Sequence, residues 1–233
     1  MTDAFGCVND NLAAIRGNIA EAADKCGRRP EDVRIMAVTK TVAPEAVNRA
    51  VELGVGLLGE NRVQEFLSKQ DAYDSSAEIH FIGHLQTNKV KYIIEPMSMI
   101  QSVDSVKLAQ EINRLASAHN KTMDILCEVN IGGEDSKSGI APDSLTELLE
   151  AAASMENLRV RGLMTIPPPA SGDIFLGRME ELFHKVRDMD IRGVSMDVLS
   201  MGMTHDYTDA VKHGSTLVRI GTGLFGARDY SKK

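Results

Sequence analysis

Lys40 is the residue whose position first suggests chemistry. It follows the apolar run VRIMAVT at residues 33–39, which predicts a buried strand. A partly desolvated lysine has a lowered pKa, and its free amine can attack a carbonyl carbon. The alternative is a lysine that extends from the rim of the fold into solvent. Both faces of the strand are apolar, so period-two alternation leaves these two interpretations open.

Small and hydroxyl-bearing residues gather in two stretches near the end of the chain. Ser200, Gly202 and Thr204 follow one apolar run, and residues 221–223 (GTG) follow the next. Small residues let backbone N–H groups approach an anion, hydroxyls add donors, and a helix N-terminus adds a favourable dipole. The two stretches therefore predict a phosphate site, with tight turns between elements as the alternative.

Arg219 lies inside the apolar run LVRIG at residues 217–221. An arginine in a strand should be paired or should face a ligand. One interpretation is a structural salt bridge, for example with Glu128 in the run TMDILCEVN. The other is a hydrogen bond to a ring nitrogen or an anion. The residue itself does not decide between them.

The histidines and cysteines do not have the spacing of a metal site. His84 ends one apolar run, where it is either a catalytic group or a rim residue, and His205 lies beside Asp206 in a predicted loop. The three cysteines are odd in number and far apart, which predicts reduced thiols, with Cys127 as a small core residue. We expect no metal.

These residues lie at the ends of predicted strands. Short apolar runs alternate with helix-patterned segments, which is typical of parallel strands covered on both faces. The runs span residues 33–39, 56–60, 78–83, 98–103, 122–130, 158–165, 196–201 and 216–221. Eight repeats in 233 residues favour a closed (β/α)8 TIM barrel, an α/β fold, over an open sheet. The carboxyl ends of barrel strands share one rim, which would bring Lys40, Arg219 and the glycine loops together.

The chain is predicted to be one domain over residues 1–233, because no Gly/Ser linker divides it. An amphipathic leading helix is expected at residues 3–25, ahead of a barrel at 33–226. The stretch IPPPASGD at 166–173 is predicted to be a rim loop, either a cover for a ligand or a rigid connector. The net charge of −7 argues against nucleic acid or anionic membrane as partners. Neither a signal peptide nor a membrane span is evident, so we expect a cytoplasmic protein.

Several motifs together resemble one family. They are AVTK (37–40), GENRVQEF (59–66), HFIGHLQTNK (80–89), VNIGGEDSKSGI (129–140), RGLMTIPP (161–168), LSMGMTHDYTDAVKHGST (199–216) and VRIGTGLFGARDY (218–230). They resemble the YggS/PROSC-type pyridoxal phosphate homeostasis proteins, which are related to the N-terminal barrel of alanine racemase (fold type III of the enzymes that use pyridoxal 5′-phosphate, PLP). The resemblance runs from Val33 to Tyr230.

The resemblance implies a role for each matching residue. Lys40 would hold PLP covalently as an internal aldimine, Asn61 would lie beside the cofactor, and Arg219 would face the pyridine nitrogen. Because arginine does not readily give up a proton, that nitrogen should stay unprotonated and the ring should be a weak electron sink.

The phosphate of PLP would be bound by three residues, Ser200, Gly221 and Thr222. This agrees with the phosphate site that the two glycine and hydroxyl stretches predict on their own.

The resemblance further implies a non-catalytic, monomeric protein that stores PLP and passes it to apo forms of PLP-dependent enzymes. One alternative is an amino-acid racemase. Racemisation needs two bases, and Tyr207, His84 or His205 would have to replace the tyrosine that related racemases take from a second domain. A second alternative is a lysine aldolase acting on sugar phosphates, which would be colourless.

Overall fold

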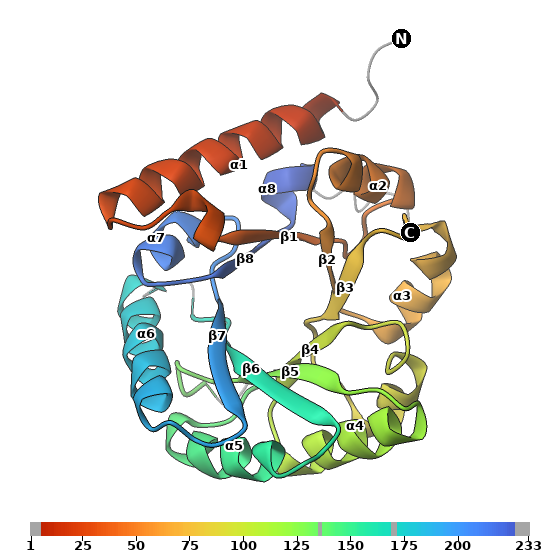
Figure 1. Cartoon of the computed structure of the whole chain (residues 1–233). Coiled ribbons are helices and arrows are strands. Elements are labelled where there is room, and N and C mark those ends of the chain that lie inside the picture. Colours follow the sequence, from red (N-terminus) through yellow and green to blue (C-terminus); the bar gives the residue numbers. More distant parts are fainter. Residues whose placement is uncertain (1–5, 135–136, 169–171, 227–233) are drawn as a thin grey trace.

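The computed structural model, which describes residues 6–134, 137–168 and 172–226, shows a closed barrel of eight parallel strands (Figure 1). Each strand pairs with the next along the chain, and β8 closes the barrel against β1. The strands are β1 (Arg34–Val38), β2 (Leu57–Glu60), β3 (Glu78–Phe81), β4 (Met99–Val103), β5 (Met123–Glu128), β6 (Leu158–Met164), β7 (Val194–Ser200) and β8 (Leu217–Ile220). All eight predicted strands and the TIM-barrel fold are confirmed.

Helices surround the barrel and connect its strands (Figure 1). The α-helices after the strands are α2 (Pro44–Glu52), α3 (Val63–Lys69), α4 (Val106–Ala118), α5 (Leu145–Ala153), α6 (Gly172–Asp188), α7 (Tyr207–Lys212) and α8 (Thr222–Phe225). Short 3-10 helices stand at η1 (Pro30–Asp32), η2 (Gln70–Ala72), η3 (Thr87–Tyr92) and η4 (Pro142–Ser144). The connection after β3 is therefore η3 in place of an α-helix. The predicted rim loop is confirmed at residues 166–168, residues 169–171 lie outside the described part, and α6 begins at Gly172.

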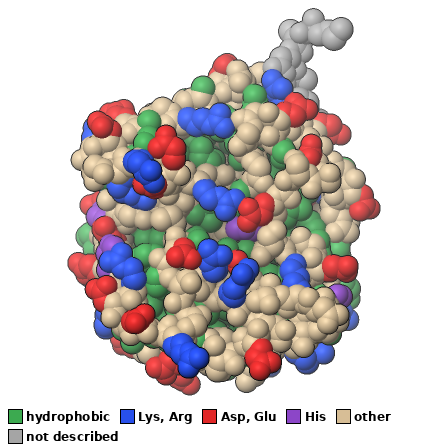
Figure 2. Space-filling view, in the orientation of Figure 1, with side chains coloured by type: hydrophobic (Ala, Val, Ile, Leu, Met, Phe, Trp, Pro, Cys, Tyr) green, Lys and Arg blue, Asp and Glu red, His purple; other side chains and the backbone are tan. Residues whose placement is uncertain are grey.

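The outer surface carries side chains of both charge signs. Acidic and basic groups are interspersed on the face shown in Figure 2, where basic side chains do not merge into one patch. No helix within the described ranges is long and apolar enough to cross a membrane.

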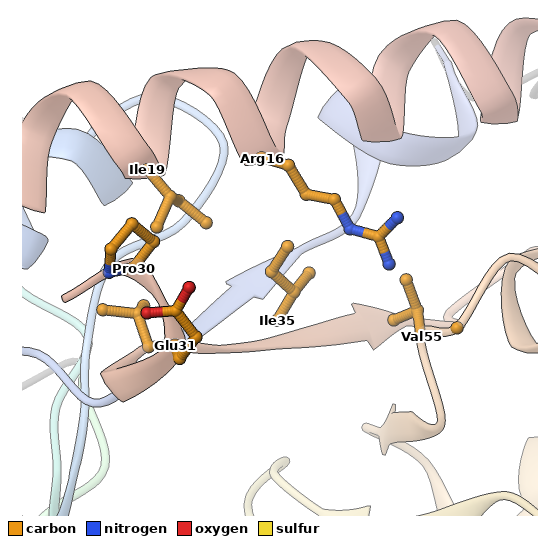
Figure 3. A pocket seen from close by; sticks show the side chains of 8 residues that line it. Arg16, Ile19, Pro30, Glu31, Ile35 and Val55 are labelled. Atoms are coloured by element: carbon orange, nitrogen blue, oxygen red, sulfur yellow. The ribbon is translucent and has the colours of Figure 1, made fainter.

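The leading helix, α1 (Gly6–Lys25), packs along α7 and α8 on the outside of the barrel (Figure 1). It was predicted at 3–25, and residues 1–5 are outside the described part. Its apolar stripe includes Leu12 and Ile15, which are buried, and the side-chain amide of Asn11 donates to the carbonyl of Leu224. A cavity of about 370 Å³ remains between α1 and the start of β1 (Figure 3). It lies away from the strand ends where the predicted site residues gather, so we assign it to packing.

The interior of the barrel is partly apolar and partly polar. Met36 of β1 belongs to an inner apolar cluster with Leu217, and Val38 packs against this cluster. Thr39 is buried on the other side of the strand, where its hydroxyl donates to Glu60. The inward face of β1 is therefore the one that Met36 and Val38 share, and continued alternation predicts that Lys40 lies on the same face. Cys127 is buried in the outer core, as predicted.

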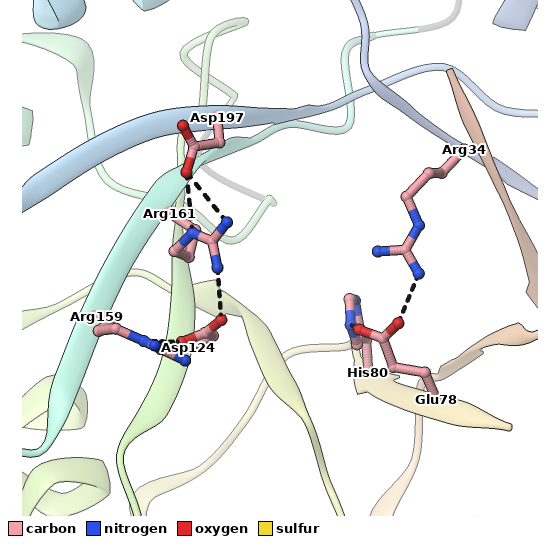
Figure 4. Close-up of polar contacts among 7 residues, drawn as sticks. All are labelled: Arg34, Glu78, His80, Asp124, Arg159, Arg161 and Asp197. Atoms are coloured by element: carbon pink, nitrogen blue, oxygen red, sulfur yellow. Dashed lines mark hydrogen bonds and ion pairs between the residues drawn. The ribbon is translucent and has the colours of Figure 1, made fainter. Parts of the chain in front are cut away.

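The amino-terminal ends of the strands form a mouth lined by ion pairs (Figure 4). Arg34 of β1 pairs with Glu78 of β3 at 2.6 Å. Asp124 of β5 accepts from Arg159 at 2.7 Å and from Arg161 at 2.9 Å. Arg161 also reaches Asp197 of β7 at 3.1 Å. Charge is thus paired across five strands at this mouth, β1, β3, β5, β6 and β7, which suits a stabilising role.

Candidate functional site

Lys40 lies half-buried directly after β1, at the carboxyl-terminal mouth. The two threonines beside it fix the backbone: the Thr39 N–H donates to the Gly59 carbonyl at 3.2 Å, and the Thr41 N–H donates to Glu65 Oε1 at 2.5 Å. Thr41 has φ of 63°, an unusual value for a β-branched residue and one that costs about 1–3 kcal/mol. Across the described ranges, the Lys40 amine has neither a hydrogen-bond partner nor an ion pair. It is therefore available to a ligand.

Asn61 follows β2 at the position that corresponds to Lys40 after β1. Val38 and Gly59 are opposite one another in β1 and β2, and Lys40 and Asn61 each follow two residues later. The Oδ1 atom of Asn61 is buried and has no hydrogen-bond partner in the described structure. Such an orphaned acceptor costs free energy unless a ligand or water satisfies it.

Arg219 is buried inside the barrel, with 3% of its surface exposed. Its Nη1 donates to Ser200 Oγ and its Nη2 to the Thr165 carbonyl, both at 2.7 Å. Burial lowers the pKa of the guanidinium to about 10. The described residues show no ion pair between Arg219 and Glu128, so the structural salt bridge considered from the sequence is not formed. Three of the five guanidinium N–H groups remain for another acceptor.

Glu128 ends β5 on the inward face, with 6% of its surface exposed. Its Oε2 atom has no hydrogen-bond partner among the described residues. Burial, reinforced by the negative charge of Asp104, raises the pKa of this carboxyl to about 7, while the positive charge of Arg219 acts in the opposite direction. A buried carboxyl group whose pKa is raised toward neutrality thus ends β5 on the inward face.

The loops after β7 and β8 meet through Thr204. Its Oγ1 accepts from the Gly223 N–H at 3.1 Å and lies 3.4 Å from Thr222 Oγ1. Gly202 has φ of 91°, which favours glycine, and a Cβ on Gly223 would come within 2.9 Å of the Thr204 methyl. Gly221 precedes α8 and lies against Val38 of β1. Backbone N–H groups and hydroxyls from both loops are therefore gathered close to the strand that carries Lys40.

Ser200 lies one layer deeper than the other predicted phosphate binders. Its hydroxyl is fully buried, accepts from Arg219 and donates to Gln101 Oε1 at 2.7 Å. The structure thus brings Gly221 and Thr222 together with Thr204, and groups Ser200 with Arg219.

The three candidate second bases of a racemase are not placed together at the mouth. His84 has 60% of its side chain exposed, and it lines an outer groove that also includes Asn61. His205 is exposed, with no ion pair to Asp206 in the described structure. The hydroxyl of Tyr207 accepts from the amide of Asn18 in α1 at 2.7 Å, on the outside of the barrel.

Sequence reasoning missed two polar residues inside the barrel, His80 in β3 and Gln101 in β4. Both are buried, and they are joined to each other and to Ser200 by hydrogen bonds. Their signal was present in the sequence, because each is a polar residue within an otherwise apolar strand, EIHF and MIQSV. No group of three or more histidine, cysteine or acidic side chains in the described part could hold a metal ion.

A half-buried lysine, a buried arginine and two glycine loops belong to the carboxyl-terminal half of a closed parallel barrel. The sequence model of the family "Alanine racemase, N-terminal domain" matches residues 11–229. The chain belongs to this family and, within it, to the pyridoxal phosphate homeostasis proteins, as its motifs predicted. The pyridoxal phosphate homeostasis protein of Aquifex aeolicus is 41% identical over 230 residues, covering 95% of this chain and 98% of that protein. The one from Escherichia coli K12 is 40% identical over 234 residues, covering 96% and 97%.

A solved structure agrees with this assignment. PipY of Synechococcus elongatus, determined with PLP bound, superposes with a TM-score of 0.83 at 28% identity, covering 94% of this chain and 100% of that one. The curated relatives are named as homeostasis proteins, while the fold is shared with alanine racemase.

Proposed function

We propose that the chain binds PLP at the carboxyl-terminal mouth, holds it covalently on Lys40, and serves PLP homeostasis without turning over amino acids. One observation carries the proposal: groups that lack partners in the described structure converge on this mouth. They are the Lys40 amine, Asn61 Oδ1, Glu128 Oε2 and the remaining donors of Arg219. PLP-binding relatives across nearly the full chain length support it.

The phosphate group fits the loops after β7 and β8. Gly221 and Thr222 supply backbone N–H groups and a hydroxyl, and Thr204 holds the two loops together. These groups are donors without negative charge, as an anion site requires. Ser200 was predicted to join them; because its hydroxyl already bonds to Arg219, we propose that it acts on the cofactor through that arginine.

The pyridine ring fits beside Arg219 and Asn61. When bound, PLP supplies an aldehyde attached to an electron-withdrawing ring. A guanidinium can only donate hydrogen bonds, so Arg219 favours an unprotonated ring nitrogen and a weak electron sink. This suits storage of the aldehyde better than carbanion chemistry on amino acids.

Lys40 provides the covalent link. Its primary amine condenses with the PLP aldehyde to form one C=N bond and to release one water molecule. Because no described residue pairs with this amine, bond formation displaces no existing partner. The link is reversible by hydrolysis or by attack of another amine, as a carrier requires.

The places of the three candidate second bases within the described residues support a carrier over a racemase. Tyr207 hydrogen-bonds to α1, and both His84 and His205 are exposed. As recipients we propose apo forms of PLP-dependent enzymes. A monomeric state and a cytoplasmic location stay predictions from the sequence and its resemblance.

The experiment begins with the absorbance spectrum of the purified chain loaded with PLP. We expect a visible band that borohydride bleaches, leaving a reduced PLP adduct that peptide mass spectrometry assigns to Lys40. The loaded chain should then activate an apo PLP-dependent enzyme while leaving L- and D-alanine unchanged. A colourless chain without an adduct would exclude covalent PLP binding, and steady multiple-turnover racemisation would overturn the non-catalytic role.

A further inference from the structure

A continuous chain of hydrogen bonds crosses the interior of the barrel from one mouth to the other. From the carboxyl-terminal end, Arg219 donates to Ser200 at 2.7 Å and Ser200 donates to Gln101 Oε1 at 2.7 Å. Gln101 Nε2 lies 2.8 Å from His80 Nδ1, and His80 Nε2 lies 2.7 Å from Glu78 Oε1. Four strands supply these five side chains: β8, β7, β4 and β3.

The two ends of the chain fix the direction of every bond in it. Arg219 has only donors, and the carboxylate of Glu78 has only acceptors. Ser200 accepts from Arg219 and must pass its own proton to Gln101 Oε1. Gln101 then donates through Nε2 to His80 Nδ1. His80 must be neutral, with its proton on Nε2 and directed at Glu78.

The environment of His80 agrees with this assignment. Burial lowers the pKa of its imidazole, which favours the neutral form, although Glu78 acts in the opposite direction. The hydrogen bond from His80 lowers the pKa of Glu78 to about 2, so Glu78 is an acceptor at neutral pH. Arg34 donates to the other oxygen of Glu78 at 2.6 Å. Figure 4 shows Arg34, Glu78 and His80 together at the amino-terminal mouth.

An inverted arrangement cannot satisfy these partners. If the Gln101 amide were rotated, its NH₂ group would face Ser200, which already accepts from Arg219. The Ser200 proton would then lack an acceptor among the described residues. The rotated Gln101 oxygen would require a proton on His80 Nδ1 in addition to the one directed at Glu78. That imidazolium would be buried, which is costly.

We propose that His80, Gln101 and Ser200 are positioning residues that hold the guanidinium of Arg219 in the orientation in which it meets the ring of PLP. Among the described residues, two hydrogen bonds fix that guanidinium: it donates one to the Ser200 hydroxyl, which Gln101 orients, and one to the Thr165 carbonyl. Gln101, a β4 residue that would not touch PLP itself, thereby sets the direction of the contact between Arg219 and PLP. The proposal rests on PLP binding, because the cofactor is what Arg219 would contact.

The first part of the test uses the protein without PLP. Nitrogen-15 NMR of the imidazole should show His80 neutral with its proton on Nε2, and the Nη groups of Arg219 should give separate signals because their rotation is restricted. Gln101→Leu should merge or broaden the Arg219 signals. Gln101→Glu keeps an acceptor for Ser200 but offers His80 Nδ1 a carboxylate, so His80 should become doubly protonated. A wild-type His80 with its proton only on Nδ1 would overturn the proposed direction.

The second part of the test uses the PLP-loaded chain. Gln101→Leu is expected to shift the visible band and to raise the Kd for PLP on the order of tenfold, whereas Gln101→Glu should restore most of the affinity. Ser102→Ala is the matched control. Ser102 is the neighbour of Gln101 in β4, and its hydroxyl is buried without a hydrogen-bond partner in the described structure. This variant should leave the band, the Kd and the His80 signals unchanged.

The outcomes separate this inference from the proposed function. A folded Gln101→Leu variant with the wild-type band and Kd would overturn the positioning role. If Gln101→Leu fails to fold, Ser200→Ala is used instead. Unchanged Arg219 signals in Ser200→Ala would also overturn the positioning role. If the wild-type chain binds no PLP, the proposed function fails, and the imidazole and guanidinium signals still decide whether this chain of residues holds Arg219.

Discussion

The two mouths of the barrel use polar side chains in opposite ways. At the amino-terminal mouth Asp124 has two arginine partners, and Arg34 and His80 share the carboxylate of Glu78 (Figure 4). At the carboxyl-terminal mouth Lys40 and Glu128 have no side-chain partners in the described part of the chain. Both mouths are built from ends of the same eight strands.

The contrast teaches how to separate a stabilising cluster from a binding site. Paired charges contribute to folding and leave nothing for a ligand to satisfy. Buried polar atoms without partners cost stability in the free protein, a cost that a ligand can offset. Substitution of Asp124, whose ion pairs do not reach the chain from Glu78 to Arg219, should therefore change stability and spare PLP binding, and substitution of Lys40 should do the reverse.

Lys40→Ala should have the largest effect on binding and almost none on folding. The visible band and the borohydride adduct should disappear completely, while some affinity remains through the phosphate loops. Because the Lys40 amine has no partner in the described structure, the free energy of unfolding should change by less than about 0.5 kcal/mol. Absorbance, adduct mapping and chemical denaturation measure the three quantities.

Lys89→Ala is the control, because this lysine belongs to the outer groove next to the site. It should keep both the band and the adduct. A Lys40→Ala variant that retains a reducible adduct at another lysine would show that the mouth does not define the covalent site.

Glu128→Gln should stabilise the free protein relative to wild type increasingly as pH rises from 4.5 through 7. In the folded state this carboxyl has a pKa of about 7, and its ordinary value is 4.5. Between these values the folded state holds a proton that the unfolded state has released, so wild-type stability falls as pH rises from 4.5 through 7. The glutamine of the Glu128→Gln variant stays neutral at every pH, so the variant does not lose this stability.

The difference between Glu128→Gln and wild type isolates this titration from all others. It should be constant below pH 4.5 and should rise by about 1–3 kcal/mol by pH 8 in favour of the variant. Denaturation curves across this range measure it. A difference that does not vary with pH would mean that Glu128 is not held protonated by the fold.

Asp124→Asn tests the paired mouth. Only 13% of the Asp124 side chain is exposed, and two arginines lose their shared acceptor, so the variant should lose about 1–2 kcal/mol of stability. Asp197→Asn, whose side chain is 57% exposed, should lose less than about 0.5 kcal/mol. Both variants should bind PLP with the wild-type Kd and spectrum. Weakened PLP binding in Asp124→Asn would remove the functional distinction between the mouths.

The sequence predicted the barrel well because near-continuous apolar strands and helical spacing are local patterns. It left the direction of Lys40 open, since residues on both faces of β1 are apolar and only the contacts of Met36 with Leu217 show which face is inside. Strands β3, β4 and β7 must also come together in the closed barrel before His80 and Gln101 meet Ser200.

The difference between Ser200 and Thr222 shows the same limit at the site. Both are hydroxyl residues in glycine-containing motifs, and the resemblance assigned both to the phosphate. Ser200 is the last residue of β7 and points inward at Arg219, while Thr222 begins α8 beside Thr204. Which side a hydroxyl faces depends on where the strand ends, and strand ends are the least certain feature of a sequence-based prediction.

Tyr207→Phe bears on the racemase alternative. Its hydroxyl accepts a hydrogen bond from Asn18 of α1, outside both mouths, so the substitution should cost about 1 kcal/mol of stability. The PLP band should not move, and amino-acid turnover should stay at background, as in wild type. Asn18→Ala is the matched partner, and its effect should not add to that of Tyr207→Phe, because each variant breaks the same bond. The opposite result would be a measurable racemisation by the wild-type chain that Tyr207→Phe abolishes. A residue outside both mouths would then act in catalysis. The presence or absence of hydrogen-bond and ion-pair partners would no longer distinguish functional residues from structural ones.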